Sequence, residues 1–177
     1  WCYYNCADEV ELYVNGKSQG IRRKRDGHQY HVMWRVTFEP GEVRVVARRN
    51  GRTTAEQTIR TAGQPHHLRL TADRQAFGDN PKGANLAFVT VDVVDKSGNL
   101  CPHAENEVFF EVEGGEIAGV DNGCASSMER FKASHRKAYK GKCLVVVKQG
   151  GSGSSVRLKA RSYSMPDASI TIENGKK

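Results

Sequence analysis

Apolar and polar residues alternate with a period of two through the first third of the chain. In residues 9–14 every second position is valine or leucine, and the positions between them are glutamate or tyrosine. This pattern predicts a strand with one buried and one hydrated face. Asn15-Gly16 follows at once and supplies the positive φ angles of a two-residue turn. We therefore expect a β-hairpin whose return strand covers 17–23.

Short segments of the same kind continue at intervals of about ten residues. Strands are expected at 29–38 and 43–49 and again after a second Asn-Gly turn at 50–51. No helical period interrupts them, and this spacing is typical of a β-sandwich. Trp34, which lies inside 29–38, is expected to fill the core from a central strand.

The segment "TAGQP" at 61–65 separates two sets of strands. It is polar apart from one alanine and contains both glycine and proline, which is typical of a linker between domains. We place one domain at 1–62 and a second at 63–177. The fold class expected is all-β, with two tandem immunoglobulin-like β-sandwich domains.

The second domain contains seven strand-like segments. The segment "LAFVTVDVVD" at 86–95 is apolar enough to be buried over much of its length. Residues 124–141 are the least regular part, and we expect no more than a short turn of helix there. The remaining strand-like segments are "HHLRLTADRQ", "NEVFFEVEGG", "GEIAGVDNG", "KCLVVVKQ", "VRLKARS" and "ASITIEN".

Composition places the chain among folded proteins. Hydrophobic residues make up 38% and charged residues 27%, so a packed core is expected rather than disorder. No apolar run approaches the roughly 18 residues of a membrane span, and no signal-peptide pattern occurs. The opening residues 1–4, "WCYY", have the composition of a strand interior, which indicates a piece of a longer protein.

The net charge of +7 raises the question of nucleic-acid binding. The basic residues cluster at 22–25 and 48–52, both at expected hairpin ends. Neither cluster is accompanied by the aromatic pattern of an RNA-binding sheet or by a helix-turn-helix signal. Solvated strand ends explain the clusters better, and we expect no nucleic-acid partner.

Cysteine spacing offers no disulfide framework and no zinc site. The five cysteines are at positions 2, 6, 101, 124 and 143, so at least one is unpaired. Cys2 and Cys6 lie too far apart on one strand for a disulfide unless the strand breaks at Asn5. Cys143 is flanked by valines and leucine and is expected in the core.

The histidines do not suit a metal either. His28 with His31, and His66 with His67, are the only groupings, and residues at these spacings on a strand face opposite sides. The segment "DKSGN" at 95–99 lacks the acidic ligands of a calcium loop and is expected to be a hairpin turn. We expect no metal and no cofactor.

The loop "GVDNG" at 119–123 is the one candidate polar site. Asp121 and Asn122 could hold a sugar hydroxyl or an ion, but the ordinary role of such residues is to bond their own backbone in a turn. The only acidic cluster comprises Glu111, Glu113 and Glu116, which occupy exposed strand positions. No catalytic residue is identified.

Several long segments together resemble the C-terminal region of family 2 glycoside hydrolases, the β-galactosidase group. They are "NCADEVELYVNGKSQG", "EPGEVRVVARRNG", "RTAGQPHHLRLTADR", "LAFVTVDVVDKSGNLCPHAENEVFFEVEGGEIAGVDNG" and "FKASHRKAYKGKCLVVVKQ". The resemblance implies two non-catalytic sandwich domains that follow a catalytic (β/α)8 barrel. The catalytic glutamates would lie in that barrel, outside this chain. It also implies a bacterial protein of the periplasm or cell exterior.

One departure from that family concerns the candidate loop. Family members usually have an acidic residue and a proline after "VDNG", whereas this chain has Cys124-Ala125. This chain therefore lacks two residues of the family pattern, and a polar function that the loop has in relatives does not carry over to it from the resemblance.

Three functions are compatible with these observations. The first is a scaffold that packs on the barrel and contributes an oligomer contact; an exposed apolar patch would favour it. The second is a carbohydrate-binding module, which would need a planar row of exposed tyrosines. The third is polyanion binding through the arginines. We rank them in this order, and the tyrosines available are Tyr3, Tyr4, Tyr13, Tyr30, Tyr139 and Tyr163.

Overall fold

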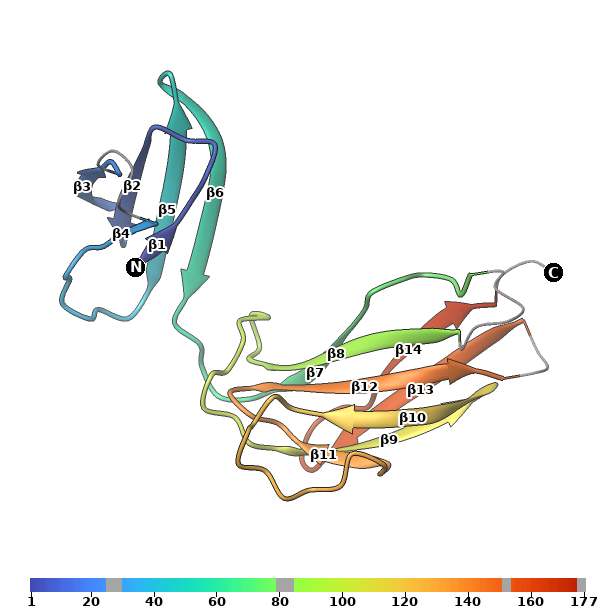
Figure 1. Cartoon of the computed structure of the whole chain (residues 1–177). Coiled ribbons are helices and arrows are strands. Elements are labelled where there is room, and N and C mark those ends of the chain that lie inside the picture. Colours follow the sequence, from blue (N-terminus) through green and yellow to red (C-terminus); the bar gives the residue numbers. More distant parts are fainter. Residues whose placement is uncertain (25–29, 79–84, 151–153, 175–177) are drawn as a thin grey trace. The chain divides into compact units, whose positions relative to one another are not determined.

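The computed structural model describes residues 1–24, 30–78, 85–150 and 154–174. Every regular element in these ranges is a β-strand, so the all-β prediction is confirmed (Figure 1). No helix long and apolar enough to cross a membrane occurs in this part of the chain. The chain divides into two compact units, Trp1–Thr61 and Ala62–Lys177. The sequence places this division one residue later.

Unit 1 is built on a four-stranded antiparallel sheet with the order β3-β2-β5-β6. The expected hairpin of β2 (Glu9–Val14) and β3 (Lys17–Arg22) is present, and β5 (Glu42–Arg49) and β6 (Arg52–Arg60) form a second one. Both turns are Asn-Gly pairs with positive φ at each residue, which matches the twist of the strands they join.

The strand expected at 29–38 is wrong in its extent. Only His31–Val32 (β4) is paired, with Cys2–Tyr3 (β1), and the residues that follow have no strand partner. Trp34 therefore does not lie on a central strand. Its ring is partly buried, and its Nε1 donates a hydrogen bond to the carbonyl oxygen of Gly20 at 3.1 Å. Alternation reports which side chains face inward, and in this antiparallel register a partner for the residues after Val32 has to come from positions before Cys2.

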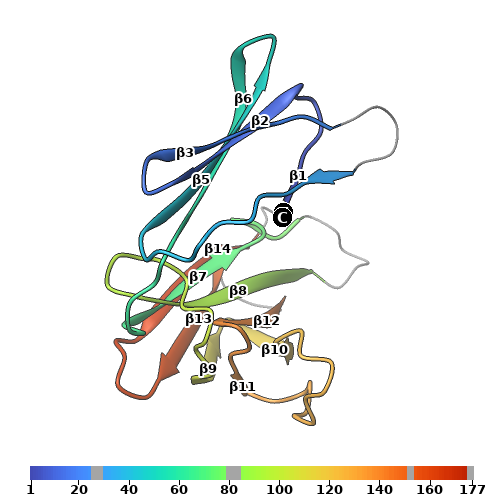
Figure 2. The ribbon, with the colours of Figure 1, turned by 90° about the vertical axis from the view of Figure 1, so that its left-hand side faces the viewer.

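The β1–β4 pair covers one face of the unit 1 sheet. Val10, Val32 and Ala47 are buried together there, and Tyr4 and Trp34 pack against them. In Figure 2 the β1 ribbon lies apart from β2, β5 and β6, as the separate pairing of β1 with β4 requires. Unit 1 is thus a small sandwich with a two-stranded second layer.

Unit 2 is a sandwich of two four-stranded antiparallel sheets (Figure 1). One has the order β10-β12-β8-β7 and the other β11-β9-β13-β14. The seven expected strands are all present, and an eighth, β11, occupies part of 124–141, where the sequence predicted no strand and no more than a short turn of helix. The strands are β7 (His67–Ala72), β8 (Leu86–Val94), β9 (Glu107–Glu113), β10 (Gly115–Asp121), β11 (His135–Lys137), β12 (Lys142–Gln149), β13 (Ser155–Ser162) and β14 (Ala168–Glu173).

Strand β8 lies at the centre of the unit 2 core. Val89, Val91 and Val93 are fully buried, which confirms the burial expected for this segment. Complete burial of such a side chain contributes about 1.5–3 kcal/mol. Cys143 on the neighbouring strand β12 is 3% exposed, as expected, and desolvation raises the pKa of its thiol to about 12. It is a core residue rather than a reactive thiol.

The turn at 95–99 anchors the start of unit 2. Asp95 Oδ1 accepts hydrogen bonds from the backbone N–H groups of Ser97 and Asn99, at 2.9 and 2.8 Å. Asp95 Oδ2 accepts one from the N–H of Gly63 at 2.8 Å. The hydrogen bond from Gly63 and then that from the Asn99 side chain contribute most to stabilising the carboxylate, and with the turn donors they lower its pKa to about 2. The expected hairpin turn is present, and it also fixes the segment that enters β7.

Candidate functional site

The candidate loop begins where β10 ends. Asp121 Oδ1 accepts hydrogen bonds from the backbone N–H groups of Asn122 and Gly123, at 2.7 and 3.2 Å. Asn122 Oδ1 accepts one from the N–H of Cys124 at 3.0 Å. These are the local backbone contacts that aspartate and asparagine make in turns.

A buried arginine on β11 connects the loop to the sandwich. The Arg136 side chain is 1% exposed, and its Nη2 lies 3.2 Å from Asn122 Oδ1 and 3.4 Å from Asp121 Oδ1. Asn122 Nδ2 in turn donates to the carbonyl oxygen of Lys137 at 2.9 Å. The two sequence-predicted residues are thus brought together, and both contact the same guanidinium.

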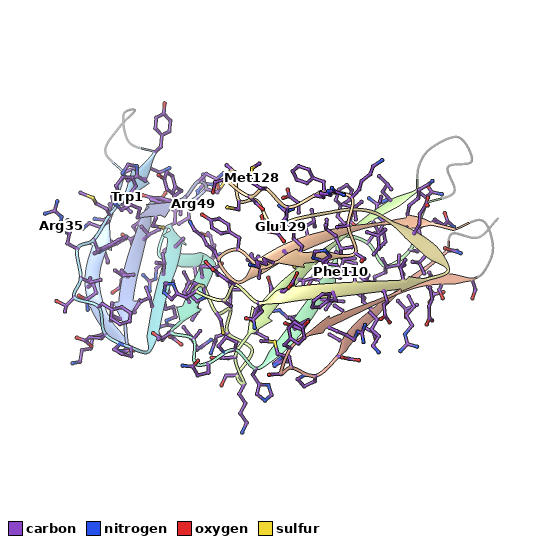
Figure 3. The ribbon with its side chains drawn as sticks, turned by 90° about the horizontal axis from the view of Figure 1, so that it is seen from below. Trp1, Arg35, Arg49, Phe110, Met128 and Glu129 are labelled. Carbon is purple, nitrogen blue, oxygen red and sulfur yellow. The ribbon has the colours of Figure 1, made fainter. Side chains whose placement is uncertain are left out.

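The far end of the loop closes over the same side chain. Arg136 Nη1 donates to the carbonyl oxygen of Glu129 at 3.0 Å, and Arg136 Nε lies 3.7 Å from Glu129 Oε2. The guanidinium also lies over the ring of Phe131, 5.4 Å from its centroid. Figure 3 labels Glu129 and its neighbour Met128 on this loop. Burial of a guanidinium is costly unless it is paired, and here Nη1 and Nη2 have hydrogen-bond partners while Nε has only the longer ion-pair contact with Glu129.

This geometry supports a structural clamp. The loop's acceptors are directed at its own backbone and at Arg136, so a long irregular segment is held against β11. The arrangement contains no nucleophile beside a base, and no pair of carboxylates faces across a cleft as glycoside hydrolysis requires. Two carboxylates, Asp121 and Glu129, face the single guanidinium of Arg136, so its buried positive charge is compensated.

Cys124 is the residue of this loop whose thiol has a lowered pKa, which favours the reactive thiolate form. Its Sγ lies 3.4 Å from Ser126 Oγ. This side-chain hydrogen bond, followed by the backbone hydrogen bonds of Ser126 and Ser127, lowers the pKa of the thiol, and the charge of Arg136 adds to the effect. No histidine or carboxylate that could act as its base contacts it within the described ranges.

The other candidates from the sequence occupy ordinary positions. Glu111, Glu113 and Glu116 are exposed on strands, as expected. Glu111 pairs with Arg161 on the adjacent strand, and Glu116 pairs with Lys148 at 2.6 Å. These cross-strand pairs stabilise the sheets only slightly because they are exposed.

The histidines show one unexpected contact. His66 precedes β7 and so escapes strand alternation, and its Nδ1 lies 3.1 Å from His67 Nδ1. Even so, no group of three or more metal-ligating side chains occurs in the described part of the chain. His31 stacks with aromatic rings, and His28 lies outside the described residues.

All five cysteines are free thiols. The strand does break near Asn5, because Cys6 has a φ of 53°, yet Cys2 and Cys6 are not bridged.

Sequence reasoning missed Arg136 and an exposed aromatic group formed by Trp1, Tyr3 and His31. Nothing in the order of residues marks Arg136 as buried, since its neighbours on β11 are charged. The aromatic group could have been found only by knowing that residues 2–3 pair with 31–32.

Comparison with known proteins places this geometry in a family context. A sequence profile described as glycoside hydrolase family 2 C-terminal domain 5 matches residues 68–171. A second profile, described only as a domain of unknown function, matches residues 1–55. The first profile thus lies within unit 2, and the second lies within unit 1.

Curated relatives are longer enzymes. The chain is 55% identical over 173 residues to the β-galactosidase BoGH2A of Bacteroides ovatus, covering 97% of this chain and 20% of that protein. It is 32% identical over 136 residues to a β-galactosidase of Thermoanaerobacter pseudethanolicus, covering 66% of this chain and 18% of that protein. The chain therefore spans about a fifth of the length of the curated relatives it matches.

Solved structures show the same architecture. A family 2 glycosyl hydrolase of Bacteroides cellulosilyticus has a TM-score of 0.81 at 32% identity, covering 96% of this chain and 22% of its own. A β-glycosidase of Bacteroides vulgatus has a TM-score of 0.84 at 25% identity, covering 94% of this chain and 21% of its own.

Proposed function

The chain belongs to glycoside hydrolase family 2, in whose C-terminal region it lies, and on that premise we propose that it is the non-catalytic scaffold of a β-galactosidase-type enzyme. In this proposal the two sandwiches pack on a catalytic barrel that is outside the chain and fix its orientation. The support is the match to a C-terminal domain profile together with coverage of only a fifth of the β-galactosidase relatives.

The observation that carries the scaffold proposal is an apolar row on the unit 1 sheet. Val14, Val43 and Ile59 are cross-strand neighbours on β2, β5 and β6 and therefore share one face. Their exposure rises along the row from 6% to 37% to 67%. A row of apolar side chains that becomes progressively exposed is typical of a surface that is covered by another domain.

Two measurements test this proposal. The purified chain should not hydrolyse an aryl β-galactoside, and activity that copurifies with it would contradict the proposal. In the longer enzyme that carries this chain, Ile59→Asp should lower the temperature of thermal inactivation and leave KM unchanged, because it places a charge in the domain contact. Thr58→Asp is the matched control, since the neighbouring position on β6 is partly exposed and lies on the opposite face.

If Ile59→Asp and Thr58→Asp behave alike, the apolar row is not a domain contact. The proposal also includes location in the periplasm or at the cell exterior, which follows from the family resemblance. Fractionation of cells that express the longer enzyme would test it, and recovery in the cytosolic fraction would contradict it.

A further inference from the structure

The two-stranded ladder of unit 1 has an aromatic outer face. In the ladder Cys2 is opposite Val32 and Tyr3 is opposite His31. Because strand residues alternate, Cys2 and Val32 face the sheet core, and Tyr3 and His31 face away from it. Trp1 lies two residues before Tyr3 and so shares the outer face.

The outer rings are held in a fixed arrangement. The rings of Trp1 and His31 are stacked with centroids 4.7 Å apart and planes within 5°. Tyr3 lies against the same imidazole, with centroids 5.3 Å apart and a tilt of 45°. Although His31 covers one face of the indole, Trp1 is still 78% exposed and Tyr3 is 65% exposed. The remaining indole face is therefore left largely uncovered by the described residues of this chain, and the stack orients it in advance.

This arrangement suits the ring of a sugar. The C–H face of a pyranose packs on an aromatic ring and removes both apolar surfaces from water, and the tyrosine hydroxyl and imidazole offer hydrogen bonds at the rim. Tyr30, which precedes β4, adds a further ring that is 82% exposed. Such a concentration of exposed aromatic surface is unusual in a folded protein without a ligand or partner.

The charges around the rings favour an acidic sugar. Residues 1–7 and 30–38 contain no aspartate or glutamate, and residues 1–62 hold 11 lysines and arginines against 7 acidic residues. Arg35 follows β4 by three residues, so its backbone lies within about 10 Å of the ladder. It is exposed and makes no salt bridge inside the described ranges, and Figure 3 shows its side chain projecting from the ribbon.

We propose that the outer face of the β1–β4 ladder is a binding site for uronic-acid-containing glycans, with a pyranose ring on Trp1 and Tyr3 and a carboxylate near Arg35. The proposal is independent of the scaffold function, because it concerns the outer surface of the β1–β4 ladder, whereas Val14, Val43 and Ile59 lie on strands of the four-stranded sheet.

The test is calorimetric titration of the whole chain with oligogalacturonate and, separately, with neutral β-1,4-galacto-oligosaccharide. Oligogalacturonate should bind with a dissociation constant of about 1 mM or below. Trp1→Ala and Tyr3→Ala should each weaken binding about tenfold, and Trp1→Phe should retain most of it. Tyr163→Ala is the matched control, because Tyr163 is 74% exposed on unit 2 and should not affect binding.

Arg35→Gln separates the acidic-sugar part of the proposal from the platform. It should weaken oligogalacturonate binding several-fold, as should about 1 M salt, without changing any binding of the neutral oligosaccharide. Thermal melting of each variant checks that the fold is retained, which is expected because the substituted side chains are exposed.

Absence of heat with both glycans would overturn the proposal, as would equal losses for Trp1→Ala and Tyr163→Ala. Equal affinity for acidic and neutral glycans that is insensitive to Arg35→Gln would overturn the choice of an acidic ligand. If this face instead contacts a protein domain of the longer enzyme, titration of the chain with either glycan should give no heat, and that result counts against the proposal.

Discussion

Two charged side chains in unit 2 are buried with nearly complete sets of partners. Arg136 is held by loop atoms from Asp121, Asn122 and Glu129, and Asp95 accepts hydrogen bonds from a turn and from Gly63. Each joins segments that are distant along the chain. Each of these two side chains therefore holds an irregular segment against the sandwich of unit 2.

Replacement of Arg136 by methionine should destabilise unit 2 by about 3 kcal/mol. The loss arises because the carbonyl oxygen of Glu129 and the side chains of Asp121 and Asn122 lose their shared donor. Urea denaturation measures the change, and Arg157→Met, at an exposed position on β13, should cost less than about 0.5 kcal/mol. A variant as stable as the parent would show that the clamp is energetically neutral.

Asp95 should make unit 2 sensitive to acid. Its pKa of about 2 in the folded chain is below the value of about 3.9 in unfolded chains. The carboxylate therefore stabilises the fold above about pH 4, and this contribution is lost as the pH falls from about 4 to 2. Asp95→Asn should be less stable than the parent at pH 7, and the difference should shrink across that window.

Denaturant midpoints measured from pH 7 to pH 2 would test this expectation. Asp167→Asn is the control, because that carboxylate is 49% exposed and pairs with Lys159 at the surface. A difference between Asp95→Asn and the parent that stays constant with pH would contradict the assignment.

At the scale of elements, turn chemistry decides where strands end. Gly98 and Gly141 lie in unit 2 turns with φ of 81° and 78°, a region that side chains disfavour. Their surroundings differ. A Cβ at Gly98 would meet no atom within 4 Å, whereas one at Gly141 would lie 2.3 Å from the carbonyl oxygen of Cys101.

This pair separates backbone strain from steric conflict. Gly98→Ala should cost about 1 kcal/mol, for the left-handed conformation alone. Gly141→Ala should cost about 3 kcal/mol or more, because the turn must also move away from Cys101. Equal losses in chemical denaturation would show that the backbone near Cys101 adjusts freely.

At the scale of the whole molecule, the two units have separate cores of different size. The unit 2 core contains buried residues from both sheets, including Val89, Leu158 and Ile172, whereas the main cluster of unit 1 consists of Val10, Val32 and Ala47. A smaller core buries less apolar surface, so unit 1 should be the less stable of the two.

Calorimetry should accordingly show two unfolding transitions. Val10→Ala should shift the lower one and Val89→Ala the higher one, each by a loss of about 2 kcal/mol, because both side chains are fully buried. Val43→Ala is the control, since this valine is partly exposed and the same truncation there should cost less. A single transition that both buried substitutions move together would contradict independent folding of the units.

Features that depend on neighbours along the chain could be read from the sequence. The Asn-Gly hairpins, the long buried strand β8, the turn at 95–99 and the core position of Cys143 all follow from local turn chemistry or from a period of two. The all-β class followed from the same local patterns, and the family was identified from several long sequence motifs that occur in the same order.

Features that depend on pairing between distant segments could not be read from the sequence. The sequence alternates through 29–38, but among the described residues of this segment only His31 and Val32 are paired, with Tyr3 and Cys2 of β1. Likewise β11 is a strand only because β9 lies beside it, and Arg136 is buried only because the loop closes over it.

The sequence by itself therefore determined most of the strands, the Asn-Gly turns and the family of this chain, since these depend on residues close together in the polypeptide. The tertiary structure alone decided which alternating segments pair and which rings come together on the outer face of the β1–β4 ladder. Those outcomes depend on contacts between residues such as Trp1 and His31, which are distant in sequence and are brought together only when the sheets form.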